Sequence, residues 1–183
     1  MIQIKRYFVI ILFTLSVLLV SSLSYSQTNS ERVDYLLEQL QNPLDYDSQQ
    51  EIKGAIMRIW EISKSANIQE KINSIGHFIN LRQYQDAEDL LTEIIMEQKD
   101  FIDAYYKRAI IHYYQGEISD AQADLYMTLD IEPRHFDALK VLGFILEKQN
   151  KKSEALDTYT KLHKILPFDE NIMEKIKSLK QTI

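Results

Sequence analysis

The sequence contains no cysteine, few glycines and prolines, and no excess of basic residues. The absence of cysteine excludes disulfides, thiolate metal sites, thiol nucleophiles and lipid attachment to a cysteine. Four glycines and three prolines are too few for a turn-rich β-sandwich and favour long helices. The 21 basic residues face 27 acidic ones, a net charge of -6, and phosphate binding needs a concentrated basic surface. We therefore expect a helical protein with no nucleic-acid partner.

The first 26 residues have the pattern of an export signal. Lys5 and Arg6 precede the apolar stretch 7–20, which is shorter than the roughly 20 residues that span a membrane. Ser24 and Ser26 then provide the small residues of a cleavage site before Gln27. The sequence predicts a signal peptide over 1–26 and a periplasmic or secreted protein, and retention of the segment as an anchor is the alternative.

The rest of the chain contains no second long hydrophobic run, so we expect no stable membrane insertion after cleavage. An exported chain without cysteine gains nothing from an oxidising compartment, and packing must supply its stability. This fits a bacterial periplasm better than a eukaryotic secretory route.

A period of 34 residues runs through the remainder of the chain. Small, large apolar and proline positions recur at that spacing, in the pairs Ala104 and Ala138, Ala109 and Gly143, Ala121 and Ala155, Leu125 and Tyr159, and Pro133 and Pro167. Small residues let two helices approach closely, large apolar residues fill the space between them, and proline ends the second helix. This is the tetratricopeptide signature, and it predicts an all-α helix-turn-helix solenoid.

The period divides the chain into segments. We predict N-terminal helices over 27–67 that pack on the solenoid, a degenerate repeat over 68–101, repeats over 102–135 and 136–169, and a C-terminal capping helix over 170–183. The first repeat is degenerate because Lys99 stands at its closing position in place of proline.

Capping residues mark the ends of the flanking helices. Ser30 is the predicted N-cap of the first helix, which Pro43 stops, and Asp47 that of the second, with Gln50 three residues on. Asp169 is the predicted N-cap of the final helix.

Residues 31–180 resemble a family of short, exported tetratricopeptide proteins of proteobacterial type. The resemblance rests on Ile59-Trp60, on Lys107-Arg108-Ala109 and on the stretch 131–139, although similar proteins often have glycine in place of Asp137. It implies the fold and the export but no settled biochemical role. Chaperone adaptors with this fold grip a C-terminal carboxylate with lysine, asparagine and arginine, and the corresponding positions here are Ile72, Gly76, Ile110 and Asp137. Binding of chaperone tails in that manner is not expected.

The residues show no catalytic constellation. The four histidines, at 77, 112, 135 and 163, form no i, i+4 metal-binding pair, and no metal site or cofactor is expected. His112 is interpreted as a core or groove histidine. There is no G-x-S-x-G elbow, and four scattered glycines cannot form a phosphate loop. We predict that the protein is not an enzyme.

Binding residues are expected on the first helices of the repeats, which line the concave face of such solenoids. Aromatic anchors with polar neighbours are typical of binding patches. The predicted partner-binding residues are Tyr106, Ile110, Tyr113, Tyr114, Arg134, His135, Lys140 and Phe144. The alternative is that these rings pack against neighbouring repeats or the N-terminal helices, and that Arg134 and His135 fix the turn between repeats.

Arg108 stands where the repeat normally has a buried leucine. A buried guanidinium must be paired, and we predict an ion pair with Asp120 or Asp124 of the adjoining helix.

These features predict a non-enzymatic scaffold or adaptor of the cell envelope that binds a peptide or helix in its concave groove. The alternative function is a small-molecule or glycan-binding accessory to an envelope enzyme, with Tyr113, Tyr114 and Arg134 in the pocket. Self-association through repeat edges is a further possibility.

Overall fold

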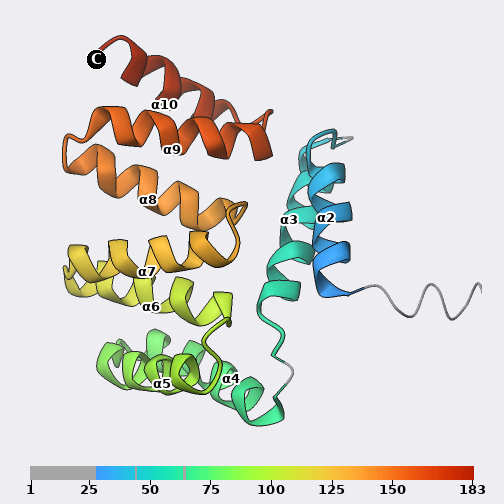
Figure 1. Ribbon diagram of the computed structural model, residues 1–183, viewed down its shortest axis with the longest axis vertical. Helices are drawn as coiled ribbons and strands as arrows, with labels where there is room; N and C mark the ends of the chain where they lie inside the picture. The colour runs from blue at the N-terminus through green and yellow to red at the C-terminus, as the bar shows by residue number, and fades with distance from the viewer. Residues whose placement is uncertain (1–27, 44, 64) are drawn as a thin grey trace, which may run out of the picture.

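The computed structural model describes residues 28–43, 45–63 and 65–183, and its elements there are all helices (Figure 1). They are α2 (Asn29–Leu40), α3 (Tyr46–Trp60), α4 (Ala66–Asn80), α5 (Tyr84–Glu97), α6 (Ile102–Gln115), α7 (Ile118–Ile131), α8 (Phe136–Lys148), α9 (Lys152–Ile165) and α10 (Glu170–Lys180). The predicted all-α solenoid is confirmed. The predicted signal peptide, 1–26, lies outside the described residues, and no helix among those described is long and apolar enough to cross a membrane.

The first two described helices begin earlier than predicted. Thr28 and Asp45 have extended backbones, and their side chains accept hydrogen bonds from the backbone N–H groups of Glu31 and Ser48 in reciprocal capping boxes. Ser30 and Asp47 were therefore wrong as N-caps, because both already lie in the first helical turn. The prediction for Asp169 is confirmed, since its carboxylate accepts from the N–H of Ile172.

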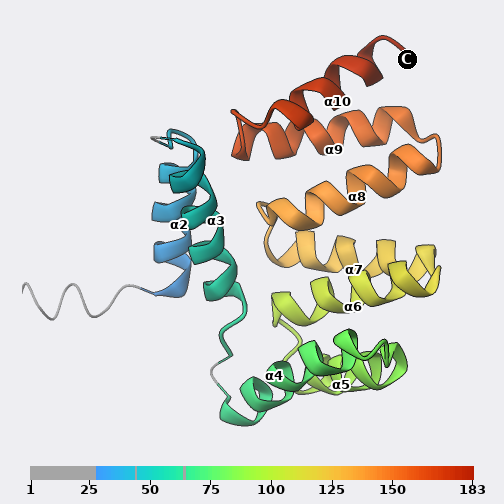
Figure 2. The same ribbon diagram turned by 180° about the vertical axis from the view of Figure 1, so that it is seen from behind.

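Helices α4 to α10 stack one on the next, each packed against its neighbour in sequence (Figures 1 and 2). The alanines of the 34-residue period are fully buried, as the pattern predicted: Ala104, Ala109, Ala121, Ala138 and Ala155. At Gly143 a methyl group would lie 2.7 Å from Cε1 of Tyr159, so α8 and α9 approach more closely than any side chain there would allow.

The apolar core has two parts. One is formed by α4, α5 and one face of α6, including Ile75, Leu91 and Ile111. The other runs from α6 to α10 and includes apolar side chains of α2 and α3, such as Leu40 and Ile56. The N-terminal helices therefore share the core of the second and third helix pairs.

The hairpin of α2 and α3 stands beside the stack, across the starts of α6 and α8 (Figures 1 and 2). Trp60 contacts the rings of His135 and Phe136, and two ion pairs join the hairpin to the stack: Glu61 to Lys107 and Asp34 to Arg134. This hairpin covers the amino-terminal ends of the helices on which the binding residues were predicted.

Candidate binding groove

A cavity of about 360 Å³ lies between α6, α8 and α10, and no residue of α2 or α3 lines it. Its lining is Ile110, Tyr113, Tyr114, Lys140, Val141, Phe144, Tyr159, Asp169, Asn171, Ile172 and Lys175. Five of the eight predicted partner-binding residues are among them. We call this cavity the groove.

Helical spacing explains why these side chains meet. Ile110, Tyr113 and Tyr114 are three and four residues apart on α6, and Lys140 and Phe144 are four apart on α8, so each set shares one helix face. Tyr113 contacts Phe144 edge to face, with ring centroids 6.1 Å apart. Each helix therefore contributes aromatic rings to the same wall.

The aromatic wall is accessible to solvent. Tyr114 is 60% exposed and Phe144 is 36% exposed, although both are large and apolar. Tyr114 also stacks on Tyr84 of α5, with centroids 5.9 Å apart, which extends the wall toward the first helix pair. Exposed aromatic side chains held by neighbouring rings provide a rigid contact surface with little entropy left to lose on binding.

The acidic groups around the groove already have partners. Glu147 accepts from Lys175 at 2.9 Å and from the hydroxyl of Tyr159 at 3.3 Å, and Asp169 caps α10. Burial, followed by the nearby Glu147 carboxylate, raises the pKa of Tyr159, so its hydroxyl stays protonated and donates. The carboxylates of Glu147 and Asp169 therefore already accept hydrogen bonds from within the chain.

Two lysines at the rim are available. Lys140 is exposed, and within the described part of the chain it has no ion pair shorter than 4 Å. Lys148 lies 5.4 Å from the ring centre of Phe144, in cation–π geometry. The groove therefore combines an aromatic wall with a basic rim.

The remaining three predicted residues, Tyr106, Arg134 and His135, lie under the hairpin and not in the groove. The ring of Tyr106 is 4.8 Å from that of His135, which is only 2% exposed and stacks on Trp60. Arg134 donates to both oxygens of Glu132 and to Asp34 of α2. These side chains already contact other parts of the same chain, as the alternative reading expected, and any role in partner binding stays a prediction.

Burial fixes the protonation of two groups at this junction. It lowers the pKa of His135 to about 3, so the ring is neutral and its Nδ1 accepts from the N–H of Ala138 as the N-cap of α8. Burial raises the pKa of Asp103 to about 6. The positive charge of Lys107 lowers this pKa, and the negative charge of Glu61 raises it further. Lys107 bridges Asp103 and Glu61 at 2.9 and 2.8 Å. The hairpin is thus fastened by buried polar groups as well as by apolar ones.

The predicted ion pair of Arg108 is confirmed. Its Nε and Nη2 donate to the two carboxylate oxygens of Asp124, both at 2.8 Å, and Nη1 donates to Thr92. This bidentate pair lies between α6 and α7 and uses the Nε–H and one of the two N–H groups of Nη2.

Sequence reasoning missed the contribution of α10 and α9 to the groove. Ile172 and Lys175 are three residues apart on α10, and Tyr159 reaches the groove from α9. The segment 170–183 was predicted only as a C-terminal capping helix. The spacing of Ile172 and Lys175 places both on one face of α10, and this spacing could have predicted that α10 lines the groove.

Known proteins resemble this chain in repeat pattern and in fold. No protein-family model matches it. A TPR repeat-containing protein of Rhizobium etli is 27% identical over 158 residues, which are 86% of this chain and 78% of that protein. The structure of MamA protein matches with a TM-score of 0.57 at 14% identity, over 84% of this chain and 81% of the other. The first TPR of Spaghetti, bound to an HSP90 peptide, matches with a TM-score of 0.57 at 14% identity, over 63% and 91%.

The chain has the tetratricopeptide-repeat fold. Four positions in this solenoid correspond to the carboxylate-gripping residues of chaperone adaptors. Ile72 is buried, with 7% of its surface exposed, and the positive charge of Lys53 acts on Asp137. Ile110 lines the groove, and Gly76 is exposed on α4. None of them is a cation that could hold a terminal carboxylate, so the groove is distinguished by its aromatic rings.

Proposed function

We propose that the protein is a non-enzymatic scaffold or adaptor of the cell envelope that binds a peptide or helix of a partner protein in the groove. The observation that supports this most is the exposed aromatic wall formed by Tyr113, Tyr114 and Phe144 on two helices of a rigid stack. Concave faces of repeat solenoids are surfaces for extended partners. The solved Spaghetti domain, which has this fold, is bound to a peptide.

The rim defines the chemistry of the partner. Glu147 and Asp169 are satisfied within the chain, whereas Lys140 and Lys148 are exposed at the edge of the aromatic wall. A segment that inserts a large apolar side chain and carries an acidic residue beside it therefore fits this groove. Charge complementarity of this kind sets orientation and the rate of association.

Crosslinking in envelope fractions, followed by purification of the tagged full chain, tests the groove. We expect Tyr113→Ala combined with Phe144→Ala to lose the captured partner while circular dichroism shows an unchanged fold. Tyr126→Ala is the matched control, because Tyr126 is 48% exposed on α7 and lies outside the groove lining. Equal capture by the groove variant and the control would contradict the assignment of the groove.

The proposed location has its own test. The predicted signal over 1–26 supports export, and we expect the tagged protein in the osmotic-shock fraction with Gln27 as its first residue. Retention in the cytoplasmic fraction would contradict the proposed location in the cell envelope. It would not bear on partner binding in the groove, which the crosslinking experiment tests.

A second candidate function is binding of a glycan or another small molecule. The cavity volume of about 360 Å³ falls in the range of roughly 300–1,000 Å³ for such sites, and its rings suit sugar stacking. Arg134, which this alternative placed in the pocket, does not line it. Calorimetric titration with oligosaccharides separates the two: saturable binding that Phe144→Ala abolishes would favour the small ligand over the peptide.

A further inference from the structure

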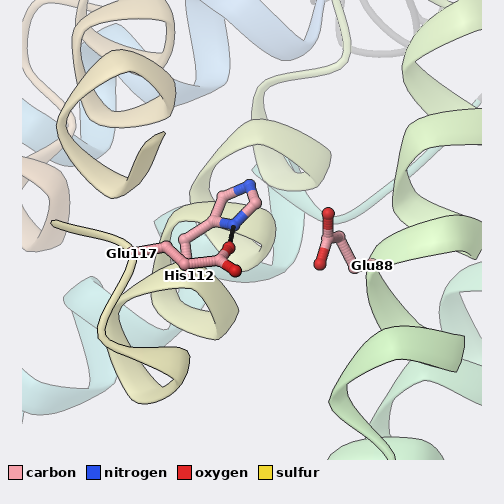
Figure 3. A group of neighbouring side chains, drawn as sticks. All are labelled: Glu88, His112 and Glu117. Atoms are coloured by element: carbon pink, nitrogen blue, oxygen red, sulfur yellow. Dashed lines mark hydrogen bonds and ion pairs between the residues drawn. The ribbon is translucent and has the colours of Figure 1, made fainter. Parts of the chain in front are cut away.

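Glu88, His112 and Glu117 bring three metal-ligating atoms together at the junction of the first and second helix pairs (Figure 3). Glu88 comes from α5, His112 from the last turn of α6, and Glu117 from the turn that begins α7. One ligand atom of each lies within 4.8 Å of the others, and His112 Nδ1 is 2.8 Å from an oxygen of Glu117. This cluster is separate from the groove, whose lining contains none of the three.

The other ring nitrogen of His112 faces a fixed carboxylate. Nε2 lies 3.5 Å from Asp124, which the bidentate pair with Arg108 holds in place. A histidine ligand characteristically donates its second N–H to such a carboxylate, which orients the ring and leaves the first nitrogen as the metal ligand. In the tautomer with the proton on Nε2, the lone pair of Nδ1 points toward the carboxylate of Glu117, 2.8 Å away, and a cation between them would relieve the contact between two acceptors.

The local charges also favour a cation. Asp124 is neutralised by Arg108. Within the described part of the chain, neither Glu88 nor Glu117 lies within 4 Å of a lysine or arginine nitrogen. The amide of Gln115 donates to Glu88 at 3.4 Å, which neutralises no charge. Two carboxylates thus share the mouth of the cluster without an ion pair to a lysine or arginine, and the Arg108 guanidinium acts on Glu88 only from a longer distance.

We propose that Glu88, His112 and Glu117 bind a divalent transition-metal ion, with Zn²⁺ as the best-matched probe. One imidazole nitrogen and two carboxylate oxygens are a usual ligand type for Zn²⁺, and water completes the shell. Bond lengths of about 2.0–2.2 Å place tetrahedral ligands about 3.4 Å apart. Small side-chain rotations would bring the present separations, 2.8 Å between His112 Nδ1 and Glu117 and at most 4.8 Å within the cluster, to that value. Because the ligands belong to α5 on one side and to α6 and α7 on the other, the ion joins the first repeat to the second.

Calorimetric titration of the full chain with ZnCl₂ tests the site, together with thermal melts in Zn²⁺ and in chelator. We expect one ion per chain and a melting temperature raised by about 5 °C or more when free Zn²⁺ exceeds its Kd a hundredfold. His112→Gln and Glu88→Gln should each weaken Zn²⁺ binding by about 10-fold or more. Substitution of Co²⁺ should give a visible absorption band that His112→Gln removes.

Two variants serve as matched controls. His163→Gln removes a histidine outside the cluster, and Asp89→Asn removes an exposed carboxylate of α5 next to Glu88. Both should bind Zn²⁺ as the unmodified chain does. If His112→Gln disturbs the fold, Glu88→Gln decides, because Glu88 is only partly buried. No Zn²⁺ binding, or the same affinity in Glu88→Gln and Asp89→Asn, would overturn the proposal.

Discussion

The indole of Trp60 stacks on the imidazole of His135, with ring centroids 4.2 Å apart and ring planes inclined by 17°. The two residues are the last of α3 and the N-cap of α8, so the stack fastens the N-terminal hairpin to the turn between the second and third helix pairs. Trp60 is the single tryptophan of the chain, and its fluorescence therefore reports on this junction alone.

We expect Trp60→Ala to lower the free energy of unfolding by about 3–5 kcal/mol, because it empties a buried site that touches both His135 and Phe136. Urea denaturation followed by circular dichroism measures the loss. Tyr46→Ala is the control on the same helix: Tyr46 is 72% exposed, and its loss should change the free energy by about 0.5 kcal/mol or less. Equal effects of the two variants would show that the hairpin does not depend on the stack.

The same junction should make stability depend on pH through two opposing groups. Folded Asp103 releases its proton only near pH 6, whereas the unfolded chain releases it near 3.8, so this group favours folding at low pH and that contribution is lost between about pH 4 and 6. Folded His135 takes up a proton only near pH 3, against 6.5 in the unfolded chain, so acidification from 6.5 toward 3 favours unfolding. The effect is about 3 kcal/mol for Asp103 and about 5 kcal/mol for His135, and the two have opposite signs.

Single variants should separate these two effects. Asp103→Asn removes one of the carboxyl groups that oppose His135, and the urea midpoint should fall more steeply between pH 6.5 and 4 than in the unmodified chain. His135→Gln leaves Asp103, and the midpoint should rise as pH falls from 6 to 4; the raised pKa of buried Asp137 acts in the same direction. Midpoints measured at several pH values test this, and parallel pH profiles for the two variants would contradict it.

The 34-residue period was sufficient to predict the stack from local pattern. Small residues at fixed spacing can only bury against the neighbouring helix, and the partner of Arg108 followed because a buried guanidinium between two helices needs an acid within reach. The groove residues on α6 and α8 followed from the same register, since one face of each helix points to the concave side.

The position of the hairpin could not be predicted in that way. The contact between Trp60 and His135 joins residues far apart in sequence, and no repeat relates α3 to the helices it covers. An aromatic residue at the concave face, such as Tyr106, looks the same in sequence whether solvent or another helix covers it. Tyr106 and Tyr113 were therefore assigned the same role, although only Tyr113 lines the groove.

The ion pair between Arg108 and Asp124 should contribute far more to stability than an ion pair at the surface. Asp124→Ala removes two of the three hydrogen bonds of the guanidinium and leaves Thr92 as its partner, so we expect a loss of about 3 kcal/mol. Asp157→Ala breaks the exposed pair with Lys161 and should cost about 0.5 kcal/mol or less. Unfolding in urea at neutral pH compares them, and a similar small loss for both would mean that water replaces the carboxylate of Asp124 without cost.

Gly143 and Gly76 should respond to alanine in opposite directions, although both lie inside helices of the stack. A methyl group on Gly143 would lie 2.7 Å from Cε1 of Tyr159, a buried ring whose hydroxyl is bonded to Glu147, so the ring cannot move freely. We expect Gly143→Ala to destabilise the fold by about 1–3 kcal/mol. Gly76→Ala meets no atom within 4 Å and should stabilise it by about 0.5–1 kcal/mol, because alanine loses less backbone entropy in a helix. Thermal unfolding of the two variants side by side measures the difference, and stabilisation by both would mean that α8 and α9 are packed less closely than the contact with Tyr159 requires.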